Sequence, residues 1–413
     1  MRVLIVAPNI SMRMGGEAAL AYHYARELNR AGVKAAGLTH ARVRDELERD
    51  PISRDVGFHF VEDAPLERGL HQIGRRAPAA LNDTIFDTAI GLSTLARLSR
   101  KARDLAKSFG ADVIHQPAPV SPQFPSFLHD MPAPVVIGPL NGGMSYPPAF
   151  ERAYSRGSRA AVGAARAVSG AANRLFAGKR SAAMVLVANE RTRRALPRGV
   201  RAERVEILVE NGVDLDLWSP APQPPVEPVF VYVGRLVWWK GVELLIRAQN
   251  AVGANARLIV IGDGPERARL EREARAANAG RIEFRGFLPQ SEIATILARS
   301  TALVLPSLRE CGGAVILEAF ASGIPAIATD WGGPQDYVTA ETGILVPPVG
   351  EEGFIQGLAS AMDALIKNPD RARAMGAAAR RRAERHYSWA AKAQAMIGLY
   401  ERAITARASK ESG

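Results

Sequence analysis

A loop with two cations follows a predicted strand in the second half of the chain. It reads Gly234-Arg235-Leu236-Val237-Trp238-Trp239-Lys240-Gly241 and precedes a helical pattern that begins near Val242. Loops at the carboxyl ends of parallel strands are where α/β folds bind ligands. Arg235 can donate two hydrogen bonds to phosphate oxygens, Lys240 supplies a point charge, and the amides of the helix start add partial positive charge. The combination suits a diphosphate, although such a loop in isolation is more often a solvated basic turn.

Two glutamates bracket a glycine turn after a later apolar run. Glu310 and Glu318 flank Cys311-Gly312-Gly313, which follows Ala302 to Leu305 and opens a predicted helix near Ala314. The glycines let backbone amides approach a ligand closely. Carboxylates accept hydrogen bonds from hydroxyl groups at roughly 1.5–3 kcal/mol each, enough to recognise a ribose or a pyranose. Glu318 lies in an otherwise apolar run, where an unpaired carboxylate is costly, and this favours a functional role over an exposed helical glutamate.

A pair of carboxylates is also the equipment of a glycosidase, which needs an acid and a nucleophile. Hydrolases need no phosphate-binding loop, however, and here Arg235 and Lys240 precede the glutamates in the same predicted domain. The phosphate-binding interpretation is therefore favoured.

Together with other motifs, these residues resemble the retaining family-4 glycosyltransferases of the GT-B fold, which belong to the group 1 glycosyl transferases. The match is dense from about residue 205 to about residue 350 and patchier before that. As an ordered set the motifs are specific for the superfamily but not for one sugar. The matching positions are Gly234-Arg235 with Lys240-Gly241, Gly262-Asp263-Gly264-Pro265, Phe284 to Leu288, the pair of glutamates, Gly323 with Pro325, Thr342 to Val346, and Asn211 to Asp214.

The resemblance implies a role for each matching position. Arg235 and Lys240 would hold the donor diphosphate, Glu318 the ribose hydroxyls, and Glu310 the transferred sugar. The remaining donor-binding positions would be Gly262 and Phe287 beside the nucleobase, and Gly312, Gly313 and Val315 at the helix start. Members of the family usually need no metal or other cofactor, because cations and amides neutralise the departing nucleoside diphosphate. The family more often has Gly-Phe-Gly where this chain has Cys311-Gly312-Gly313, which leaves the identity of the donor open.

The first half of the chain adds weaker candidates. Gly15 and Gly16 start a predicted helix after the first strand, where the family places a glycine loop against the donor phosphates. His115 ends a predicted strand, and the family often has a histidine here near the sugar, so we expect His115 to be catalytic together with Glu310, Lys240 and Arg235. The loop from Gly138 to Met144 resembles one that lines the acceptor cavity in some members that build bacterial polysaccharides. For each of these three features, a structural role explains the residues about as well.

Strand-like runs alternate with helical periodicity along both halves of the chain, which predicts two doubly wound parallel sheets flanked by helices. Four prolines between 220 and 225 interrupt both patterns and mark a hinge. The resemblance implies two Rossmann-like domains that face a cleft, with a C-terminal helix crossing back to the first. We expect an acceptor-side domain over 1–212, joined by the helix at about 390–413, and a donor-binding domain over 213–389. The predicted strands are Val3 to Ala7, Val113 to His115, Val135 to Ile137, Met184 to Val187, Ile207 to Val209, Val229 to Val233, Leu258 to Ile261, Ile282 to Arg285, Ala302 to Leu305, Pro325 to Thr329 and Gly343 to Val346.

The net charge of the chain is concentrated in one segment. Residues 151–204 hold 13 Lys/Arg against 3 Asp/Glu, so this segment carries +10 of the total charge of +11. Such a distribution argues against nucleic-acid coating and for one local basic element. An apolar stripe between Phe150 and Phe176 opposite the arginines suggests contact with anionic lipid or a pyrophosphoryl lipid acceptor. The alternative is a helix whose stripe packs on its own domain.

The composition of the chain indicates its compartment. Its single cysteine, Cys311, cannot form an internal disulfide, which is typical of a reducing compartment. The apolar run from Val3 to Ala7 is too short for a secretion signal, and no uncharged apolar stretch approaches the roughly 18 residues of a spanning helix. We therefore expect a cytoplasmic protein, with any membrane contact being peripheral on the inner face of the cell membrane.

These observations favour transfer of a sugar from a nucleoside diphosphate sugar to a saccharide or lipid-linked saccharide, in envelope or exopolysaccharide assembly. Two alternatives on the same fold are a nucleotide-sugar epimerase and a sugar phosphorylase. A non-catalytic sugar-nucleotide-binding module is disfavoured by the complete set of Arg235, Lys240, Glu310 and Glu318. A dinucleotide oxidoreductase is disfavoured because no G-x-G-x-x-G follows the first strand.

Overall fold

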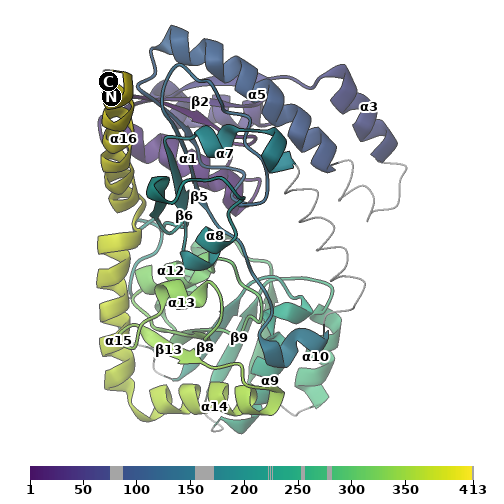
Figure 1. Cartoon of the computed structure of the whole chain (residues 1–413). Coiled ribbons are helices and arrows are strands. Elements are labelled where there is room, and N and C mark those ends of the chain that lie inside the picture. Colours follow the sequence, from purple (N-terminus) through teal and green to yellow (C-terminus); the bar gives the residue numbers. More distant parts are fainter. Residues whose placement is uncertain are drawn as a thin grey trace. The chain divides into compact units, whose positions relative to one another are not determined.

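The computed structural model describes residues 1–74, 87–153, 172–221, 223, 225, 227–252, 256–276 and 281–411 (Figure 1). The chain divides into two compact units. Unit 1 contains Met1–Gly143, Ala160–Glu210 and Lys392–Gly413, and unit 2 contains Met144–Arg159 and Asn211–Ala391. Each unit is built on one parallel sheet with helices, so the predicted pair of doubly wound α/β sheets is confirmed.

Unit 1 has a parallel sheet with the strand order β3-β2-β1-β4-β5-β6-β7. Its central strands are short apolar runs that are buried on both faces, as expected for a parallel sheet covered by helices. The strands are β1 (Arg2–Val6), β2 (Lys34–His40), β3 (Gly57–Val61), β4 (Val113–Gln116), β5 (Val135–Leu140), β6 (Met184–Val187) and β7 (Val205–Ile207).

The core of unit 1 lies between its sheet and the long helix α5 (Asp87–Phe109). Leu95, Leu98, Ala102 and Ala106 recur at helical spacing on α5 and are buried against β1, β2 and β3. The other described helical segments of this unit are α1 (Gly16–Arg30), η1 (Ala41–Val43), α2 (Arg44–Arg49), η2 (Pro51–Arg54), α3 (Pro65–Gly74), α7 (Gly178–Ser181), α8 (Glu190–Arg194) and η5 (Ala202–Arg204).

The sequence analysis did not predict two strands of this sheet, β2 and β3. β2 reads Lys-Ala-Ala-Gly-Leu-Thr-His, a composition with little preference for strands. Tertiary context overrides that preference, because β2 pairs with β1 on one side and with β3 on the other. The predicted strand Ile207 to Val209 lies two residues earlier, as β7.

Unit 2 has a parallel sheet with the strand order β10-β9-β8-β11-β12-β13. The strands are β8 (Val229–Val233), β9 (Arg257–Ile261), β10 (Ile282–Gly286), β11 (Ala302–Leu305), β12 (Ala326–Thr329) and β13 (Gly343–Val346). All six agree with the predicted runs to within one residue at each end. The helical segments between them are η6 (Trp238–Lys240), α9 (Val242–Ala251), α10 (Arg267–Ala276), α11 (Gln290–Ala298), α12 (Ala314–Ala321) and α13 (Pro334–Tyr337).

The chain beyond β13 is helical in several segments rather than in one. They are α14 (Glu351–Lys367), α15 (Pro369–Arg382), the π-helical turn η7 (Ala383–Tyr387) and α16 (Trp389–Glu411). In unit 2, α14 packs on α9 and α15 packs on α12 (Figure 1). From Lys392 onward α16 belongs to unit 1, as expected for a C-terminal helix that returns to the first domain. Within the described residues, no helix has the length and apolar character needed to cross a membrane.

Candidate functional site

The predicted donor-site loops of unit 2 follow two neighbouring strands at the centre of the sheet. Successive strands run outward from β8 through β9 to β10 on one side, and from β11 through β12 to β13 on the other. The chain therefore changes direction across the sheet between β8 and β11. In open parallel sheets, ligands bind outside the carboxyl ends of the strands at such a switch point. The loop 234–241 follows β8 and the loop 306–313 follows β11, so both candidate loops lie at this position.

Glycines allow the backbones of these loops to touch. Gly241 has a φ of +66°, and a Cβ atom there would lie 2.2 Å from the carbonyl oxygen of Pro306. Gly262, at the end of β9, has a φ of +130°, and a Cβ atom there would lie 1.9 Å from the carbonyl oxygen of Gly234. Only glycine combines this backbone conformation with such close approach. The amide of Leu308 donates a further hydrogen bond of 2.8 Å to the carbonyl oxygen of Trp239.

Lys240 and Glu310 meet across the switch point. The ammonium group of Lys240 donates a hydrogen bond to Oε2 of Glu310 and forms an ion pair with it. Their side chains are 19% and 14% exposed, so both charges are largely withdrawn from water yet remain accessible. Each side chain thereby restrains the position of the other. The structure thus brings together the predicted ligand of the diphosphate and the predicted ligand of the transferred sugar.

Arg235 lies in the same loop with its side chain exposed. Its carbonyl oxygen accepts a hydrogen bond of 3.0 Å from the buried hydroxyl of Tyr232, which fixes the backbone. Among the residues that the structure describes, the guanidinium group of Arg235 has no ion pair or hydrogen bond. A well-anchored backbone with an unengaged guanidinium group is suited to binding an anion.

Glu318 is partly buried in α12. Burial raises the pKa of its carboxyl group to about 7. Within the described part of the chain, its side-chain oxygens accept no hydrogen bond and form no ion pair. A desolvated carboxylate without partners is unfavourable, and hydroxyl donors from a ligand would stabilise its charged form.

The remaining predicted donor-binding residues of unit 2 are in three places. Gly312 and Gly313 lead into α12, and Val315 is in the first turn of that helix, where leading amides have no intrahelical acceptor. Gly262 ends β9. Phe287 follows the edge strand β10, and its aromatic side chain is 85% exposed. Its predicted role beside a nucleobase stays a prediction.

In unit 1, Gly16 is the first residue of α1 and lies on the switch point between β1 and β4. A Cβ atom at Gly16 would meet no atom within 4 Å, so the space beside it is open. The next residue, Glu17, accepts a hydrogen bond of 2.9 Å from the amide of Val120, and burial raises the pKa of its carboxyl group. The start of α1 is thereby tied to the loop after β4.

His115 is fully buried, and both of its ring nitrogens are engaged within unit 1. Nε2 donates a hydrogen bond of 2.6 Å to the carbonyl oxygen of Gly138. Nδ1 therefore accepts from the hydroxyl of Tyr400 in α16, at 2.7 Å. Burial lowers the pKa of His115 to about 4, so the ring is neutral near pH 7. These bonds fasten α16 to the sheet. The predicted catalytic role of His115 stays a prediction.

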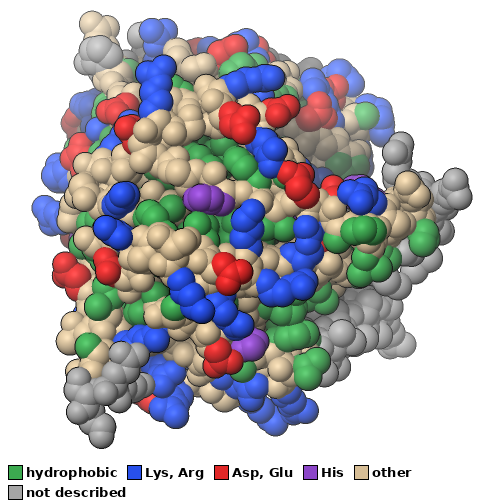
Figure 2. Space-filling model, turned by 90° about the horizontal axis from the view of Figure 1, so that it is seen from above, with side chains coloured by type: hydrophobic (Ala, Val, Ile, Leu, Met, Phe, Trp, Pro, Cys, Tyr) green, Lys and Arg blue, Asp and Glu red, His purple; other side chains and the backbone are tan. Residues whose placement is uncertain are grey.

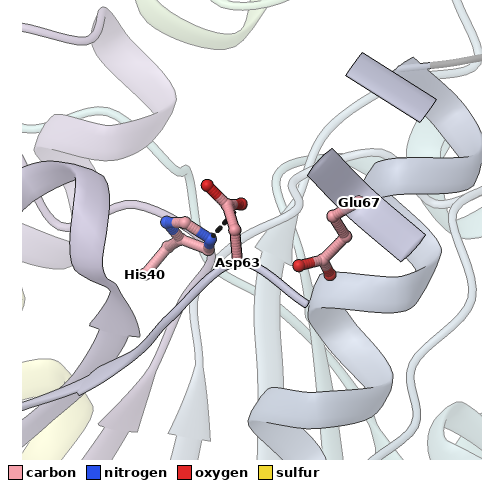
Figure 3. Close-up of side chains that lie close together, drawn as sticks. All are labelled: His40, Asp63 and Glu67. Atoms are coloured by element: carbon pink, nitrogen blue, oxygen red, sulfur yellow. Dashed lines mark ion pairs between the residues drawn. The ribbon is translucent and has the colours of Figure 1, made fainter. Parts of the chain in front are cut away.

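A cluster that the sequence analysis did not identify contains His40, Asp63 and Glu67, whose ligand atoms lie within 4.8 Å of one another (Figure 3). Nδ1 of His40 accepts hydrogen bonds from two nitrogens of Arg42, each at 3.1 Å. A neutral imidazole has one lone pair, so Nε2 must carry the hydrogen that faces Asp63 at 3.0 Å.

Glu67 is also fully engaged. Its carboxylate accepts hydrogen bonds from the amide of Ala64 at 2.7 Å, from Thr94 at 3.2 Å and from Arg97 at 2.6 Å. These bonds join the start of α3 to α5. The contacts of the cluster are therefore typical of a structural hydrogen-bond network rather than of a metal-binding site.

The structure describes only part of the predicted basic element. Residues 154–171, which hold most of the apolar stripe, lie outside the described residues. Of the rest, Phe176 packs on Phe127 with ring centroids 4.2 Å apart, whereas Leu175 is 76% exposed. On the face drawn in Figure 2, Lys and Arg side chains are interspersed with Asp and Glu side chains. Contact of this element with lipid stays a prediction.

Comparison with known proteins finds a family match in the second half of the chain and relatives that match about half of it. Residues 219–382 match the model of the family described as glycosyl transferases group 1. The chain is 32% identical over 222 residues to the alpha-maltose-1-phosphate synthase of Mycolicibacterium smegmatis, which covers 48% of this chain and 57% of that protein. It is 35% identical over 206 residues to a GDP-mannose-dependent alpha-mannosyltransferase of Mycobacterium tuberculosis, covering 49% and 50%. The chain thus spans about half the length of the curated relatives that it matches.

Solved structures resemble the chain over nearly its whole length. Sucrose-phosphate synthase from Thermosynechococcus elongatus has a TM-score of 0.68 at 21% identity, covering 98% of this chain and 100% of that one. Anabaena Alr3699/HepE in complex with UDP and glucose has a TM-score of 0.61 at 18% identity, covering 97% and 99%. At these identities the likeness establishes the fold.

Proposed function

Because this chain belongs to the group 1 glycosyl transferases and has their GT-B fold, we propose that it transfers a sugar from a nucleoside diphosphate sugar to a saccharide or lipid-linked saccharide. The transfer retains the anomeric configuration and requires no metal. Envelope or exopolysaccharide assembly on the cytoplasmic side is the proposed setting.

The observation that carries this proposal is the meeting of Lys240 and Glu310 at the switch point of unit 2. A cation for phosphate and a carboxylate for hydroxyl groups lie side by side there. Glu318 and Arg235 supply a second carboxylate and a second cation that are both without partners among the described residues. A nucleoside diphosphate sugar carries the matching groups, which are phosphates for the cations and hydroxyls of the ribose and the sugar for the carboxylates.

Each of these residues has a chemical role in the proposed transfer. The donor diphosphate replaces Glu310 as the partner of Lys240, and Glu310 then accepts hydrogen bonds from the sugar. The bond between the anomeric carbon and the diphosphate oxygen breaks with its electron pair on the diphosphate, while the acceptor oxygen bonds to the same carbon and its proton leaves to phosphate or solvent. Lys240, Arg235 and the leading amides of α12 stabilise the charge that develops on the diphosphate.

The names of the relatives support this class of reaction without identifying the substrates. One relative is named for GDP-mannose and one solved structure contains UDP and glucose, so both bases are candidates for the donor. Another relative is named a phosphatidylinositol dimannoside mannosyltransferase, which supports a lipid-linked acceptor as one candidate. A peripheral contact of residues 151–204 with anionic lipid belongs to the same proposal. Flotation with liposomes of neutral and of anionic composition tests it, because binding must depend on the charge of the lipid.

The test of the function has two steps. A thermal-shift panel of UDP, GDP, ADP and CMP identifies the nucleotide. A ligand that binds only the folded state raises the melting temperature of the protein. The corresponding nucleotide sugars are then incubated with saccharide acceptors and with EDTA. A new glycosidic bond in the presence of EDTA supports the proposal. An isomerised donor would instead indicate an epimerase, a sugar phosphate a phosphorylase, and binding without any turnover a non-catalytic module.

A further inference from the structure

A short segment that follows the first 143 residues packs among the donor-site loops of unit 2. We call Met144–Phe150 the strap. Its residues belong to unit 2 although the chain before Met144 belongs to unit 1. From the sequence we expect this segment in the first domain, directly after the loop from Gly138 to Met144 that resembles an acceptor-cavity loop. Its contacts concern the donor loops instead.

The centre of the strap is Tyr146, which is only 8% exposed. Its ring stacks on Trp238, with centroids 5.1 Å apart and an interplanar angle of 15°. The guanidinium group of Arg309 also lies over the Tyr146 ring, 5.7 Å from its centroid, which is within the range of cation–π attraction. Trp238 lies in the single turn η6 that ends at Lys240, and Arg309 directly precedes Glu310. One ring thus contacts the near neighbours of both members of the ion pair.

The residue before Tyr146 fastens a third loop. Nε1 of Trp331 donates a hydrogen bond of 2.9 Å to the carbonyl oxygen of Ser145. The Trp331 loop in turn holds the backbone of Glu310, because the amide of Gly333 donates a hydrogen bond of 2.8 Å to the carbonyl oxygen of Glu310. Three separate loops around the ion pair are therefore connected through consecutive residues of the strap.

We infer that Tyr146 is a positioning residue of the donor site, whose ring holds the loops of Lys240 and Glu310 in register for the nucleoside diphosphate sugar. The inference rests on the proposed function, since it concerns the same site. A one-turn helix such as η6 has little stability of its own. Packing of Trp238 against the buried Tyr146 ring stabilises this turn. Arg309, from the loop after β11, packs on the same ring.

The strap provides a matched control at its other end. Phe150 packs edge to face on Phe354 of α14, with centroids 6.2 Å apart. This contact also anchors the strap to unit 2 but involves none of the donor loops. Removal of the Phe150 ring therefore tests the effect of loosening the strap in general, whereas removal of the Tyr146 ring tests its effect on the ion pair.

The experiment compares Tyr146→Ala, Tyr146→Phe and Phe150→Ala with the wild-type protein. Nucleotide affinity is measured by calorimetry with whichever of UDP or GDP stabilises the wild type more, and melting temperature is measured alongside. We expect Tyr146→Ala to weaken binding by about tenfold, the size of one stacked and cation–π ring contact. Tyr146→Phe keeps the ring and should stay within about twofold of the wild type, and Phe150→Ala should lower the melting temperature without changing affinity.

Wild-type affinity in Tyr146→Ala would overturn the inference, as would equal losses in Tyr146→Phe and Tyr146→Ala, because the ring would then not be the group that acts. An equal loss of affinity in Phe150→Ala would also overturn it, by reducing Tyr146 to a general structural contact. These outcomes are distinct from failure of the proposed function, in which the wild-type protein itself would bind neither nucleotide.

Discussion

Lys240 and Glu310 are 70 positions apart in the chain, and in the folded protein they form an ion pair beside the carboxyl ends of β8 and β11. Each would otherwise be a partly desolvated, unpaired charge, which is costly. The pair therefore stabilises the site without ligand and competes with the ligand for Lys240. A donor must separate the two charges. Its phosphates must then replace Glu310 as the partner of Lys240, and its hydroxyls must replace Lys240 as the partner of Glu310.

The competition predicts opposite effects of two substitutions on nucleotide binding. Lys240→Met should weaken binding of the preferred nucleoside diphosphate by about 10- to 100-fold, the loss of one charge-assisted hydrogen bond. Glu310→Gln should bind the same nucleotide at least as tightly as the wild type while losing most transfer, because it no longer competes for Lys240. Calorimetry with transfer assays separates the two effects.

Lys367→Met is the matched control for these variants, because it removes an exposed lysine that pairs with Asp363 on α14 in the same unit. It should leave affinity and turnover unchanged. Near-normal turnover in Lys240→Met would show that the phosphate site is elsewhere.

Glu318 predicts a pH dependence of donor binding. Burial raises its pKa to about 7, and hydroxyl donors of a ligand favour the ionised form. Affinity should therefore rise as the pH increases through 7, and binding should release a proton. In Glu318→Gln the affinity should be weaker and this rise should be absent. Calorimetry at pH 6 and pH 8, in buffers of different ionisation enthalpy, measures both; an unchanged pH profile in the variant would exclude Glu318 as the titrating group.

The raised pKa of Glu318 also affects the stability of the fold. Stability should fall as the pH rises, whereas donor affinity should increase. A carboxyl group whose pKa is raised on folding stabilises the protein below its ordinary value of 4.5, and that contribution is lost as the pH rises through 7. Glu318→Gln removes the titration. Without ligand it should therefore be more stable than the wild type at pH 8, and chemical denaturation at pH 5 and pH 8 should show the difference between the two proteins growing with pH.

The burial of His115, whose Nδ1 accepts a hydrogen bond from Tyr400, predicts a loss of stability in acid. The pKa of His115 is lowered from 6.5 to about 4, so the buried neutral ring stabilises the fold above pH 6.5, and this contribution is lost as the pH falls through 4. The full effect is on the order of 3 kcal/mol. The free energy of unfolding, measured by urea denaturation between pH 4 and pH 8, should depend less on pH in His115→Gln. Glutamine can keep both hydrogen bonds but does not titrate.

Tyr400→Phe gives an independent measure of this contact. It leaves a buried ring nitrogen without its donor, so it should cost about 1–3 kcal/mol at neutral pH. If His115 instead contacts the sugar, His115→Gln should lower turnover with little effect on stability, which would contradict the structural role.

Cys311 offers a direct probe of the donor loop. It is exposed, it follows Glu310 directly, and the chain contains 1 cysteine, so a thiol reagent reports on this loop alone. Saturation with the preferred nucleotide sugar should slow labelling severalfold. The protection should be lost in Lys240→Met at the same ligand concentration. Labelling at an unchanged rate in the saturated wild-type protein would argue that the ligand binds away from this loop.

The sequence by itself determined the local features of this protein. The strands of unit 2, the glycine loops after β8 and β11, and the start of α12 follow from apolar runs and from residues with special backbone freedom, which act over a few positions along the chain. The candidate donor residues could be predicted because each lies beside such a local signal. β2 lacked that signal and was missed. β3 was missed although its Phe and Val residues favour a strand.

Only the tertiary structure decided which of these residues meet. Nothing near His115 in the sequence indicates that Tyr400, 285 positions later, occupies its second nitrogen. Nothing near Tyr146 indicates that its ring contacts both Trp238 and Arg309. Such contacts depend on the order of strands in a sheet and on where the chain returns, and these are set by the packing of the whole unit rather than by any short run of residues.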